Sequence, residues 1–329
     1  MLVCIDDKTK SLLCCPFCHS SIAVLKDGFV CRACRLFFPL LMLSTGEEEQ
    51  NITYDFRILK PDFAKSQNER QWDSTQENYK IYHHEKRKND DQLKEYLDAI
   101  ESVREIYTEE FNLSGSILDV GGEIGTLRHY LENRVSSYIN VDPLDSAFDR
   151  LANCNNLLRA YPELKKPCNF IIANAEKLPF LSNSFDWIHM RSTIDHFFDP
   201  YIAVLESFRC IKNGGRLLIG LSIIDKIENL SSQVKKTKLK SNRASDLKQK
   251  IKTVFGVKNI AILYKIKNIL LRKTYNHHAH EDEHMFCFTH RELIELCTFA
   301  GWKLEKEHWQ KAPFEHCLYV SFTASKNVN

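Results

Sequence analysis

The segment ILDVGGEIGTL, residues 117–127, is a short apolar run that leads into a glycine-rich turn. Leu127 and Leu131 then fall on one helical face, so we expect a strand, a turn and a helix in this order. This order opens a doubly wound α/β domain, in which the turn contacts a nucleotide-like ligand. Because Glu123 lies inside the turn, its charge restricts the kind of ligand that the turn can hold.

The charges around the turn disfavour a phosphorylated ligand. A dinucleotide site needs G-x-G-x-x-G, with helix amides facing a pyrophosphate. Here the glycines are spaced differently, and Asp119 and Glu123 would repel such a group. S-adenosylmethionine has no phosphate and carries a net positive charge from its sulfonium and ammonium groups. The turn therefore favours a cationic nucleoside of this kind.

Further apolar runs follow the turn at the spacing of an α/β domain. About twenty residues on, YINVD ends at Asp142, whose carboxylate can accept hydrogen bonds from both hydroxyls of a ribose. Next come a strand ending at Asn174, a fourth strand FDWIHM, and a fifth strand within GRLLIGLSII. This alternation of strands and helices predicts a parallel sheet covered on both faces.

These residues resemble class I S-adenosylmethionine-dependent methyltransferases of the type 11-like group, over residues 115–224 and 284–323. The resemblance implies a Rossmann-like, seven-stranded sheet that ends in an antiparallel pair. It implies that the loop STIDHFFDP, residues 192–200, faces the transferred methyl group. It also implies that the cofactor is bound by Asp119, Gly121, Gly122, Gly125, Asp142, Asn174 and Ala175.

Two positions depart from the pattern of this family. Position 123 is usually glycine, and position 174 is usually an aspartate that accepts the adenine amino group. The amide oxygen of Asn174 can still accept that hydrogen bond, but without the charge. A methyltransferase fold that no longer binds its cofactor is the alternative that these departures raise.

Asp195 and His196 are the candidates for a general base. A hydroxyl or amine acceptor has to lose a proton on methylation, and histidine titrates near neutral pH. Both residues lie in the loop that is expected to face the methyl group. The alternative is that they only maintain the conformation of that loop.

The N-terminal region contains two Cys-x-x-Cys pairs, which predict a structural Zn²⁺ site. The four ligands are Cys15, Cys18, Cys31 and Cys34. Between the pairs, Asp27–Gly28 is a preferred two-residue hairpin turn that would bring them together. Cys14 competes with Cys15 for the first position, and His19 is a possible substitute ligand; the Cys15 spacing fits better.

Residues 11–45 resemble the zinc ribbon that occurs as a small partner subunit of RNA and protein methyltransferases and as a fusion to methyltransferase domains. We therefore expect a zinc ribbon over 1–45 and a linker with N-terminal helices over 46–110. The methyltransferase domain would cover 111–329. In the second region Trp72 and its neighbouring aromatics either pack against the next domain or close over the cofactor.

A basic insertion is expected over residues 226–283 of this domain. Residues 226–274 contain fourteen Lys and Arg and two acidic residues, a net charge of +12, whereas the whole chain carries +2 and the remainder therefore −10. Apolar residues recur there at helical spacing. Such a basic amphipathic segment can lie on an anionic membrane, cover the cleft of an anionic substrate or neutralise RNA phosphates. The alternative is a helical lid or an oligomer surface whose lysines are only solvated.

The N-terminus has no basic and apolar leader, and no apolar stretch approaches the roughly 20 residues of a membrane span. We expect a cytoplasmic protein that can bind peripherally to a membrane. The leading hypothesis is O- or N-methylation of a small molecule, sugar or lipid-linked glycan. The alternatives are an RNA methyltransferase and a non-catalytic scaffold whose ribbon binds a partner.

Overall fold

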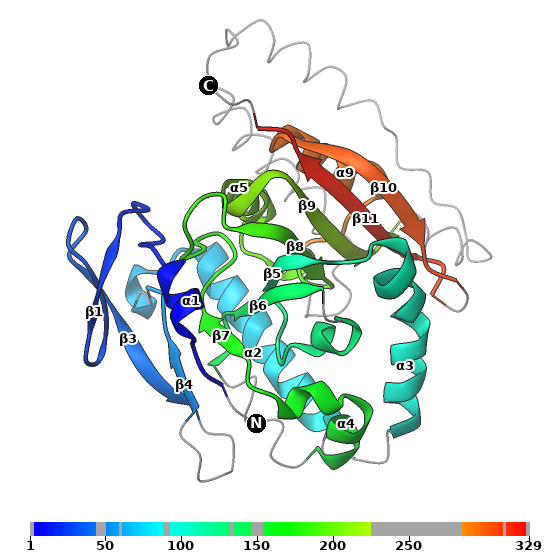
Figure 1. The fold of residues 1–329 in the computed structure, drawn as a ribbon, viewed down its shortest axis with the longest axis horizontal. Helices are drawn as coiled ribbons and strands as arrows, with labels where there is room; N and C mark the ends of the chain where they lie inside the picture. The colour runs from blue at the N-terminus through cyan, green and yellow to red at the C-terminus, as the bar shows by residue number, and fades with distance from the viewer. Residues whose placement is uncertain are drawn as a thin grey trace, which may run out of the picture.

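The computed structural model describes residues 3–43, 51–58, 61–87, 93–131, 134–145, 154–224, 285–311 and 314–326, without the side chains of 79–80 and 82–87. The basic insertion expected at 226–283 lies outside these residues. The described chain contains two sheets, one of four strands and one of seven (Figure 1). None of its described helices is both long and apolar enough to cross a bilayer.

The seven-stranded sheet has the order β10-β11-β9-β8-β5-β6-β7. Strands β5 to β9 are parallel, and β11 pairs antiparallel with both β9 and β10. This confirms the expected α/β fold with its closing antiparallel pair. The strand bounds are β5 Gly115–Val120, β6 Val135–Asp142, β7 Asn169–Ile172, β8 Phe185–Arg191, β9 Ile211–Ser222, β10 Trp302–Trp309 and β11 Cys317–Ala324.

Helices cover both faces of this sheet because side chains alternate along each strand. Ile117 packs in a cluster with α3 (Leu93–Glu105) and α4 (Asn155–Ala160), whereas its neighbour Leu118 packs with α5 (Pro200–Cys210) and α9 (His290–Phe299). Helix α9 begins with the expected capping box and is followed by Gly301 at φ 98°.

The helix expected after the glycine turn is shorter than predicted. Thr126–Tyr130 form a 3₁₀ helix, and the backbone is extended again at Leu131. Only a few residues remain before β6 begins at Val135, so a longer helix does not fit the connection.

The N-terminal sheet has the order β1-β2-β3-β4, with bounds Ile22–Leu25, Gly28–Cys31, Leu36–Leu43 and Asn51–Tyr54. Strand β4 therefore occupies part of the segment expected to be a linker. The hairpin turn is Lys26–Asp27, one residue earlier than predicted, because Leu25 pairs with Gly28. Glycine is required at position 28 by close packing, since a Cβ there would lie 2.2 Å from the carbonyl oxygen of Phe38.

The N-terminal sheet lies beside β7, the edge strand of the large sheet (Figure 1). Phe56 N donates to Ile172 O at 2.8 Å, Cys4 N donates to Cys168 O at 3.1 Å, and the Thr53 hydroxyl donates to Phe170 O. One hydrophobic cluster continues from the N-terminal sheet into the α/β domain. The N-terminal sheet therefore covers a strand edge that would otherwise expose unpaired backbone groups.

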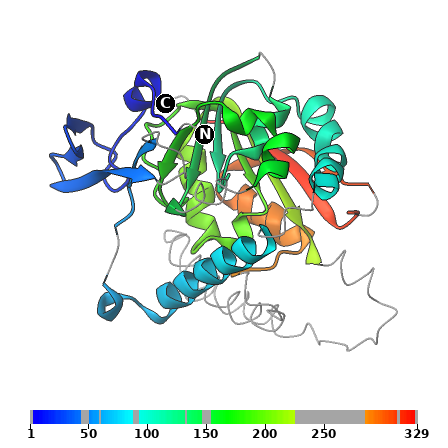
Figure 2. The ribbon, with the colours of Figure 1, turned by 90° about the horizontal axis from the view of Figure 1, so that it is seen from below.

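Helix α2 (Gln67–Arg87) lies beside the α/β domain (Figure 2). In the sequence it stands between the strands of the N-terminal sheet and those of the large sheet. The indole nitrogen of Trp72 donates to His196 O at 2.9 Å, and Gln76 Nε2 donates to the same oxygen at 3.4 Å. These bonds hold the N-terminal half of α2 against the loop that follows β8.

Candidate active site and cysteine cluster

The glycine turn after β5 brings the chain close to two neighbouring strands. Gly121 and Gly125 have φ values of 72° and 78°, which favour glycine. A Cβ at Gly121 would lie 2.6 Å from Thr193 Cγ2, and one at Gly122 would lie 2.5 Å from Asp119 Oδ2. The turn is therefore packed too tightly for side chains at positions 121 and 122.

Glu123 adopts the left-handed backbone conformation, with φ 49°. At this position the family that the sequence resembles usually has glycine. Its backbone is held on both sides: Glu123 N donates to Asp142 Oδ2 at 3.0 Å, and Asn140 Nδ2 donates to Glu123 O at 2.7 Å. Non-glycine residues pay about 1 kcal/mol or more for this conformation. The hydrogen bonds to the end of β6 offset that cost.

Asp119 is buried beneath the turn within a chain of hydrogen bonds. Its Oδ2 accepts from the Tyr138 hydroxyl at 2.6 Å, and its Oδ1 accepts from His189 Nδ1 at 2.7 Å. The second nitrogen of His189 then accepts from the Tyr107 hydroxyl at 2.9 Å. Burial raises the pKa of Tyr107 and of Tyr138, which keeps both phenols protonated.

This arrangement changes the role expected for Asp119. The sequence suggested two carboxylates facing the ligand, but the oxygens of Asp119 are bound by protein groups. Tyr107, Tyr138 and His189 were not identified from the sequence. Their positions depend on the register of β5 with its neighbours, in which Asp119 is opposite both Asn140 and His189.

A central cavity lies at the carboxyl ends of β5, β6, β7 and β8. The cavity is small: its volume is about 60 Å³, whereas ligand pockets usually have volumes of roughly 300–1,000 Å³. Its walls are Trp72, Gln76, Val120, Gly121, Val141–Leu144, Ala173–Glu176, Ser192, Thr193, His196 and Phe197. The cavity thus brings together the predicted residues Gly121, Asp142, Asn174, Ala175 and His196.

Two larger cavities share walls with the central one. The arginine cavity, about 340 Å³, shares Gly121, Ser192 and Thr193 with it and is also lined by Gly122, Glu123 and Arg191. The α2 cavity, about 530 Å³, shares Trp72, Gln76, Pro143, Leu144, Asn174 and Glu176. A nucleoside-sized ligand would have to extend from the central cavity into its neighbours.

Asp142 is buried at the end of β6, and two backbone amides hold its carboxylate in place. Oδ1 accepts from Leu144 N at 2.9 Å, and Oδ2 accepts from Glu123 N at 3.0 Å. Each carboxylate oxygen can accept a second hydrogen bond. Asp142 can therefore hold the glycine turn and still accept hydrogen bonds from two hydroxyl groups.

Asn174, just after β7, carries an unused acceptor. Its Oδ1 is buried and has no hydrogen-bond partner among the described residues, although a buried polar atom normally has one. Because Asn174 lines the central cavity, this oxygen suits a ligand amino group. The residues at this end of the cavity thus fit an adenosine: hydroxyl acceptors on Asp142 and an amino-group acceptor on Asn174.

The two candidate bases differ in their surroundings. His196 lines the central cavity, and Asp195 does not. His196 Nε2 lies 4.0 Å from Asp195 Oδ2. The backbone carbonyl of Asp195 accepts from the amides of Met285 and Phe286 at 3.0 and 2.9 Å. Only His196 is therefore placed to reach a ligand in the central cavity.

Glu176 is a further ionisable group that the sequence did not single out. It lines both the central and the α2 cavities, and its Oε1 accepts from Asp199 N at 2.9 Å. Burial raises the pKa of this carboxyl to about 7 despite the backbone hydrogen bonds that lower it. Glu176 therefore changes charge in the neutral pH range.

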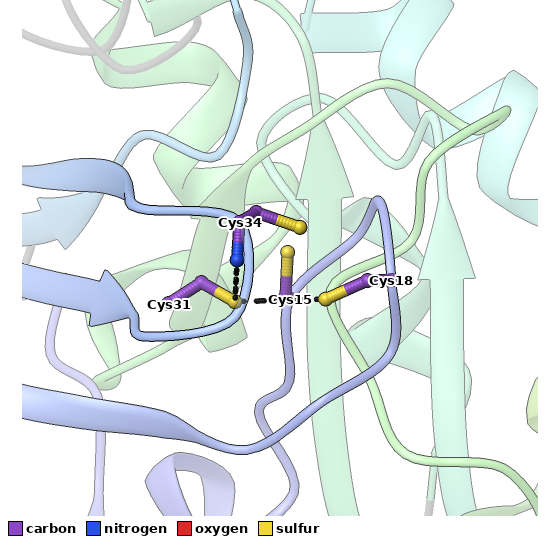
Figure 3. A group of neighbouring side chains, drawn as sticks. All are labelled: Cys15, Cys18, Cys31 and Cys34. Carbon is purple, nitrogen blue, oxygen red and sulfur yellow. Dashed lines mark hydrogen bonds between the residues drawn. The ribbon is translucent and has the colours of Figure 1, made fainter.

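The four predicted cysteines come together at one end of the N-terminal sheet, as Figure 3 shows. The sulfurs of Cys15, Cys18, Cys31 and Cys34 all lie within 4.8 Å of one another. Tetrahedral zinc with Zn–S bonds of about 2.3 Å requires sulfurs about 3.8 Å apart. Hydrogen bonds, led by that from Ser20, lower the pKa of the Cys18 thiol to about 6.

The cluster resolves the alternatives for the first ligand position. It contains Cys15, whereas Cys14 is buried away from it and donates its amide to Pro179 O at 2.9 Å. His19 is not in the cluster; its Nε2 lies 3.7 Å from Glu206 Oε1. A four-thiolate set, typical of a structural zinc site, fits this geometry.

Residues 118–219 match the sequence profile of a family described as "Methyltransferase domain". Over these residues the chain is therefore similar to methyltransferase domains, the class of domain that its resemblance predicted. The ubiquinone/menaquinone biosynthesis C-methyltransferase UbiE of Rickettsia typhi is 31% identical over 117 residues, which cover 32% of this chain and 44% of the relative. An uncharacterized methyltransferase of Schizosaccharomyces pombe is 33% identical over 30% of this chain and 37% of that protein.

The chain thus spans less than half the length of these curated relatives. Among solved structures, the PH0226 protein of Pyrococcus horikoshii aligns with a TM-score of 0.45 at 16% identity, over 70% of this chain and 92% of that one. The N-methyltransferase NodS of Bradyrhizobium japonicum, in complex with S-adenosyl-L-homocysteine, aligns with a TM-score of 0.41 at 10% identity, over 70% and 88%.

Proposed function

We propose that the protein transfers a methyl group from S-adenosylmethionine to an acceptor that reaches the central cavity beside His196. The proposal rests on two hydrogen-bond acceptors at one end of that cavity. They are the carboxylate of Asp142 and the amide oxygen of Asn174, which has no hydrogen-bond partner among the described residues. These acceptors suit the ribose and the adenine amino group of the cofactor. The methyltransferase domain at residues 118–219 supports the same function.

This chain's residues would hold the cofactor along the carboxyl ends of the strands. Asp142 would accept from the ribose, while Asn174 and Ala175 would contact adenine. The packed glycines at 121 and 122 allow the backbone to approach the ligand, and Gly125 supports the turn. When bound, S-adenosylmethionine supplies a methyl group already activated by a positively charged sulfur. The protein's main task is therefore to align the acceptor.

His196 is our candidate for the group that takes the acceptor proton. It lines the central cavity, and its backbone carbonyl is fixed by Trp72 and Gln76 of α2. The nearby Asp195 carboxylate, 4.0 Å away, would stabilise the imidazolium that forms. Asp195 thus becomes a positioning residue in this proposal. Its backbone also ties the loop to Met285 and Phe286.

We also propose that the cysteine cluster holds one structural Zn²⁺. Four thiols within 4.8 Å of one another support this assignment, because four thiolates complete a closed tetrahedral site. Such a site has no open position for catalysis. Its role would be to stabilise the sheet that covers β7.

For the acceptor we propose an anionic small molecule, sugar or lipid-linked glycan. The residues on either side of the basic segment lie near the proposed site: Ile224 N donates to Phe288 O at 3.0 Å, and Met285 N donates to Asp195 O at 3.0 Å. The sequence between these anchors is strongly basic, with a net charge of +12 over residues 226–274. A positive segment attached beside the methyl-transfer loop supports an anionic acceptor or an anionic membrane surface.

The test begins with calorimetric titration of the zinc-loaded protein with S-adenosylhomocysteine. We expect micromolar binding that weakens at least tenfold in Asp142→Asn and is unchanged in Asp62→Asn, a control with an exposed carboxylate. Absence of binding by the wild type would reject the function. Transfer of a labelled methyl group is then compared between anionic vesicles with membrane-derived glycans and total RNA. Labelling of RNA alone would replace the proposed acceptor class.

A further inference from the structure

The carboxyl group of Glu176 lies between two loops of the proposed site. Glu176 belongs to the turn after β7, two residues beyond Asn174, whose amide oxygen is the proposed acceptor for adenine. It lines both the central cavity and the α2 cavity. Its Oε1 accepts from Asp199 N at 2.9 Å, at the end of the loop that follows β8. One side chain therefore joins the adenine end of the site to the loop that carries His196.

Backbone amides surround this carboxyl group with hydrogen-bond donors. The amides of Phe198, Asp199 and Glu176 itself bond to it and favour its ionised form. A carboxylate accepts at both oxygens, whereas a protonated carboxyl or a primary amide presents a donor at one of its two ends. That donor would face a backbone N–H group. The ionised side chain is therefore the form that satisfies these amides best.

His196 lies between two points at which its loop is anchored. On one side, its backbone carbonyl accepts from Trp72 Nε1 at 2.9 Å and from Gln76 Nε2 at 3.4 Å, both on α2. Three positions further on, Asp199 N is held by Glu176. The second anchor therefore comes from the turn that is proposed to bind adenine, at the other end of the cavity.

The surroundings of Glu176 make its ionised form unfavourable for the fold. Burial raises the pKa of this carboxyl to about 7, and the nearby charge of Asp199 acts in the same direction. Among the described residues, the other titratable and charged groups that line the two cavities are Asp142, His196, Arg57, Lys65, Lys177, Glu69, Asp73 and Glu77. Groups with perturbed pKa values in a cavity concentrate at functional sites.

We propose that ionised Glu176 is a positioning residue, which anchors the loop carrying His196 to the turn that binds adenine. This inference rests on the proposed function, because it concerns how the base of that reaction is held. The role is indirect and acts through the amides of Phe198 and Asp199. When Glu176 is protonated at acidic pH, the anchor weakens and His196 is held less firmly.

Hydrogen exchange measured by mass spectrometry tests the anchor without any acceptor. The wild type and Glu176→Gln are compared at pH 6 and pH 8, over the peptide that contains Phe198 and Asp199. Comparison at the same pH cancels the intrinsic pH dependence of exchange. Glutamine resembles the protonated carboxyl, so the two proteins should exchange alike at pH 6. At pH 8 the variant should exchange about tenfold faster, as expected for loss of a hydrogen bond to a charged group.

Matched variants separate the charge from the packing. Glu176→Asp keeps a carboxylate on a shorter side chain and should restore part of the protection at pH 8. Glu315→Gln, at an exposed carboxyl, should exchange as the wild type does at both pH values. Peptides from the large sheet should not exchange faster in any of these proteins, which shows that the fold is kept.

A kinetic comparison extends the test to the reaction. With an acceptor that takes up the methyl label, the ratio of wild-type to Glu176→Gln kcat should rise about tenfold from pH 6 to pH 8. The affinity for S-adenosylhomocysteine should stay within about threefold. Titration of His196 affects both proteins alike and cancels in this ratio, so the rise reports the charge of Glu176.

The outcomes are distinct from those that decide the proposed function. Exchange that is faster in Glu176→Gln by the same factor at both pH values would indicate packing alone, and equal exchange at both would indicate no anchor. Either result overturns the inference, as does a kcat ratio that does not change with pH. If the wild type does not bind S-adenosylhomocysteine, the proposed function fails, while the exchange data still decide whether Glu176 anchors the loop.

Discussion

Replacing Glu176 by glutamine should make the protein more stable at alkaline pH and leave it unchanged at acidic pH. Burial raises the pKa of this carboxyl from 4.5 to about 7 in the folded protein. In the unfolded chain the pKa returns to its ordinary value. Between the two values the folded state holds a proton that the unfolded state has lost, so the free energy of unfolding falls as pH rises.

The magnitude follows from the pKa shift. A shift from 4.5 to about 7 corresponds to about 3 kcal/mol of lost stability once the pH exceeds the folded value. Glu176 is half-buried, so contact with solvent reduces the effect, and we expect about 1.5 kcal/mol. Glutamine cannot ionise, but its Oε1 can still accept from Asp199 N, a bond of 2.9 Å in the wild type.

Urea unfolding of wild type and Glu176→Gln at pH 5 and pH 8 measures this effect. Taking the difference between the two proteins cancels every other titrating group, including the cysteines. The difference should grow by about 1.5 kcal/mol from pH 5 to pH 8, equivalent to roughly 2 °C in melting temperature for a chain of this size. Glu315→Gln, at an exposed carboxyl, is the control. A difference that does not change with pH would refute the reasoning.

Three further predictions concern the metal, the turn and the base. Metal analysis should find about one zinc per chain, and chelation should lower both the melting temperature and the affinity for S-adenosylhomocysteine; unchanged affinity would show that the ribbon does not support the site. Glu123→Gly should raise the free energy of unfolding by about 1 kcal/mol in urea, because glycine accepts φ 49° without strain, whereas Gly125→Ala at φ 78° should lower it. His196→Asn should reduce kcat by about 10²- to 10⁴-fold for an acceptor that must lose a proton, with the S-adenosylhomocysteine affinity kept. A kcat close to that of the wild type would exclude His196 as the base.

The succession of strands along the chain and the glycine turn could be predicted from the sequence because local patterns indicate them. Apolar runs of strand length, each followed by a polar residue such as Asp142 or Asn174, indicate the carboxyl ends of a parallel sheet. The capping box of α9, Thr289 with Glu292, is likewise a local signal. Each of these features depends on residues within a few positions of one another.

The surroundings of Asp119 could not be predicted in this way. His189 and Tyr138 reach it from β8 and β6, on either side of β5, and their contact requires the register of three strands. Tyr107 enters through a π-helical turn, Ile106–Glu110, at the end of α3. A histidine inside an apolar strand was the available signal, but its partner lies 70 positions away.

The hairpin in the ribbon illustrates the same limit over a shorter distance. Asp27–Gly28 has the composition of a two-residue turn, yet the structure uses Lys26–Asp27 and places Gly28 in β2. The deciding contact is with β3, because only glycine lets the backbone approach Phe38 O. Turn propensity describes the two strands of a hairpin alone, and here a third strand changes the outcome.

The position of the ribbon argues for a role within this chain. The non-catalytic alternative requires a ribbon free to bind a partner, but backbone groups of the ribbon are hydrogen-bonded to Cys168, Pro179 and Leu181 of the α/β domain. Phe38 lies on β3, the strand that follows the last cysteine of the cluster. The centroid of its ring is 4.8 Å from that of the Phe56 ring. Phe56 N is bonded to Ile172 O of β7.

Arg57, which follows Phe56, connects the ribbon to the proposed cofactor site. Arg57 donates to Pro143 O at 2.6 Å and pairs with Asp55 and Asp145. Pro143 directly follows Asp142, the proposed ribose ligand, and lines the central cavity. Since these contacts form one continuous packed path, loss of zinc should disturb the end of β6 as well as the ribbon. Weaker cofactor binding after chelation is therefore expected from the same contacts that cover the sheet edge.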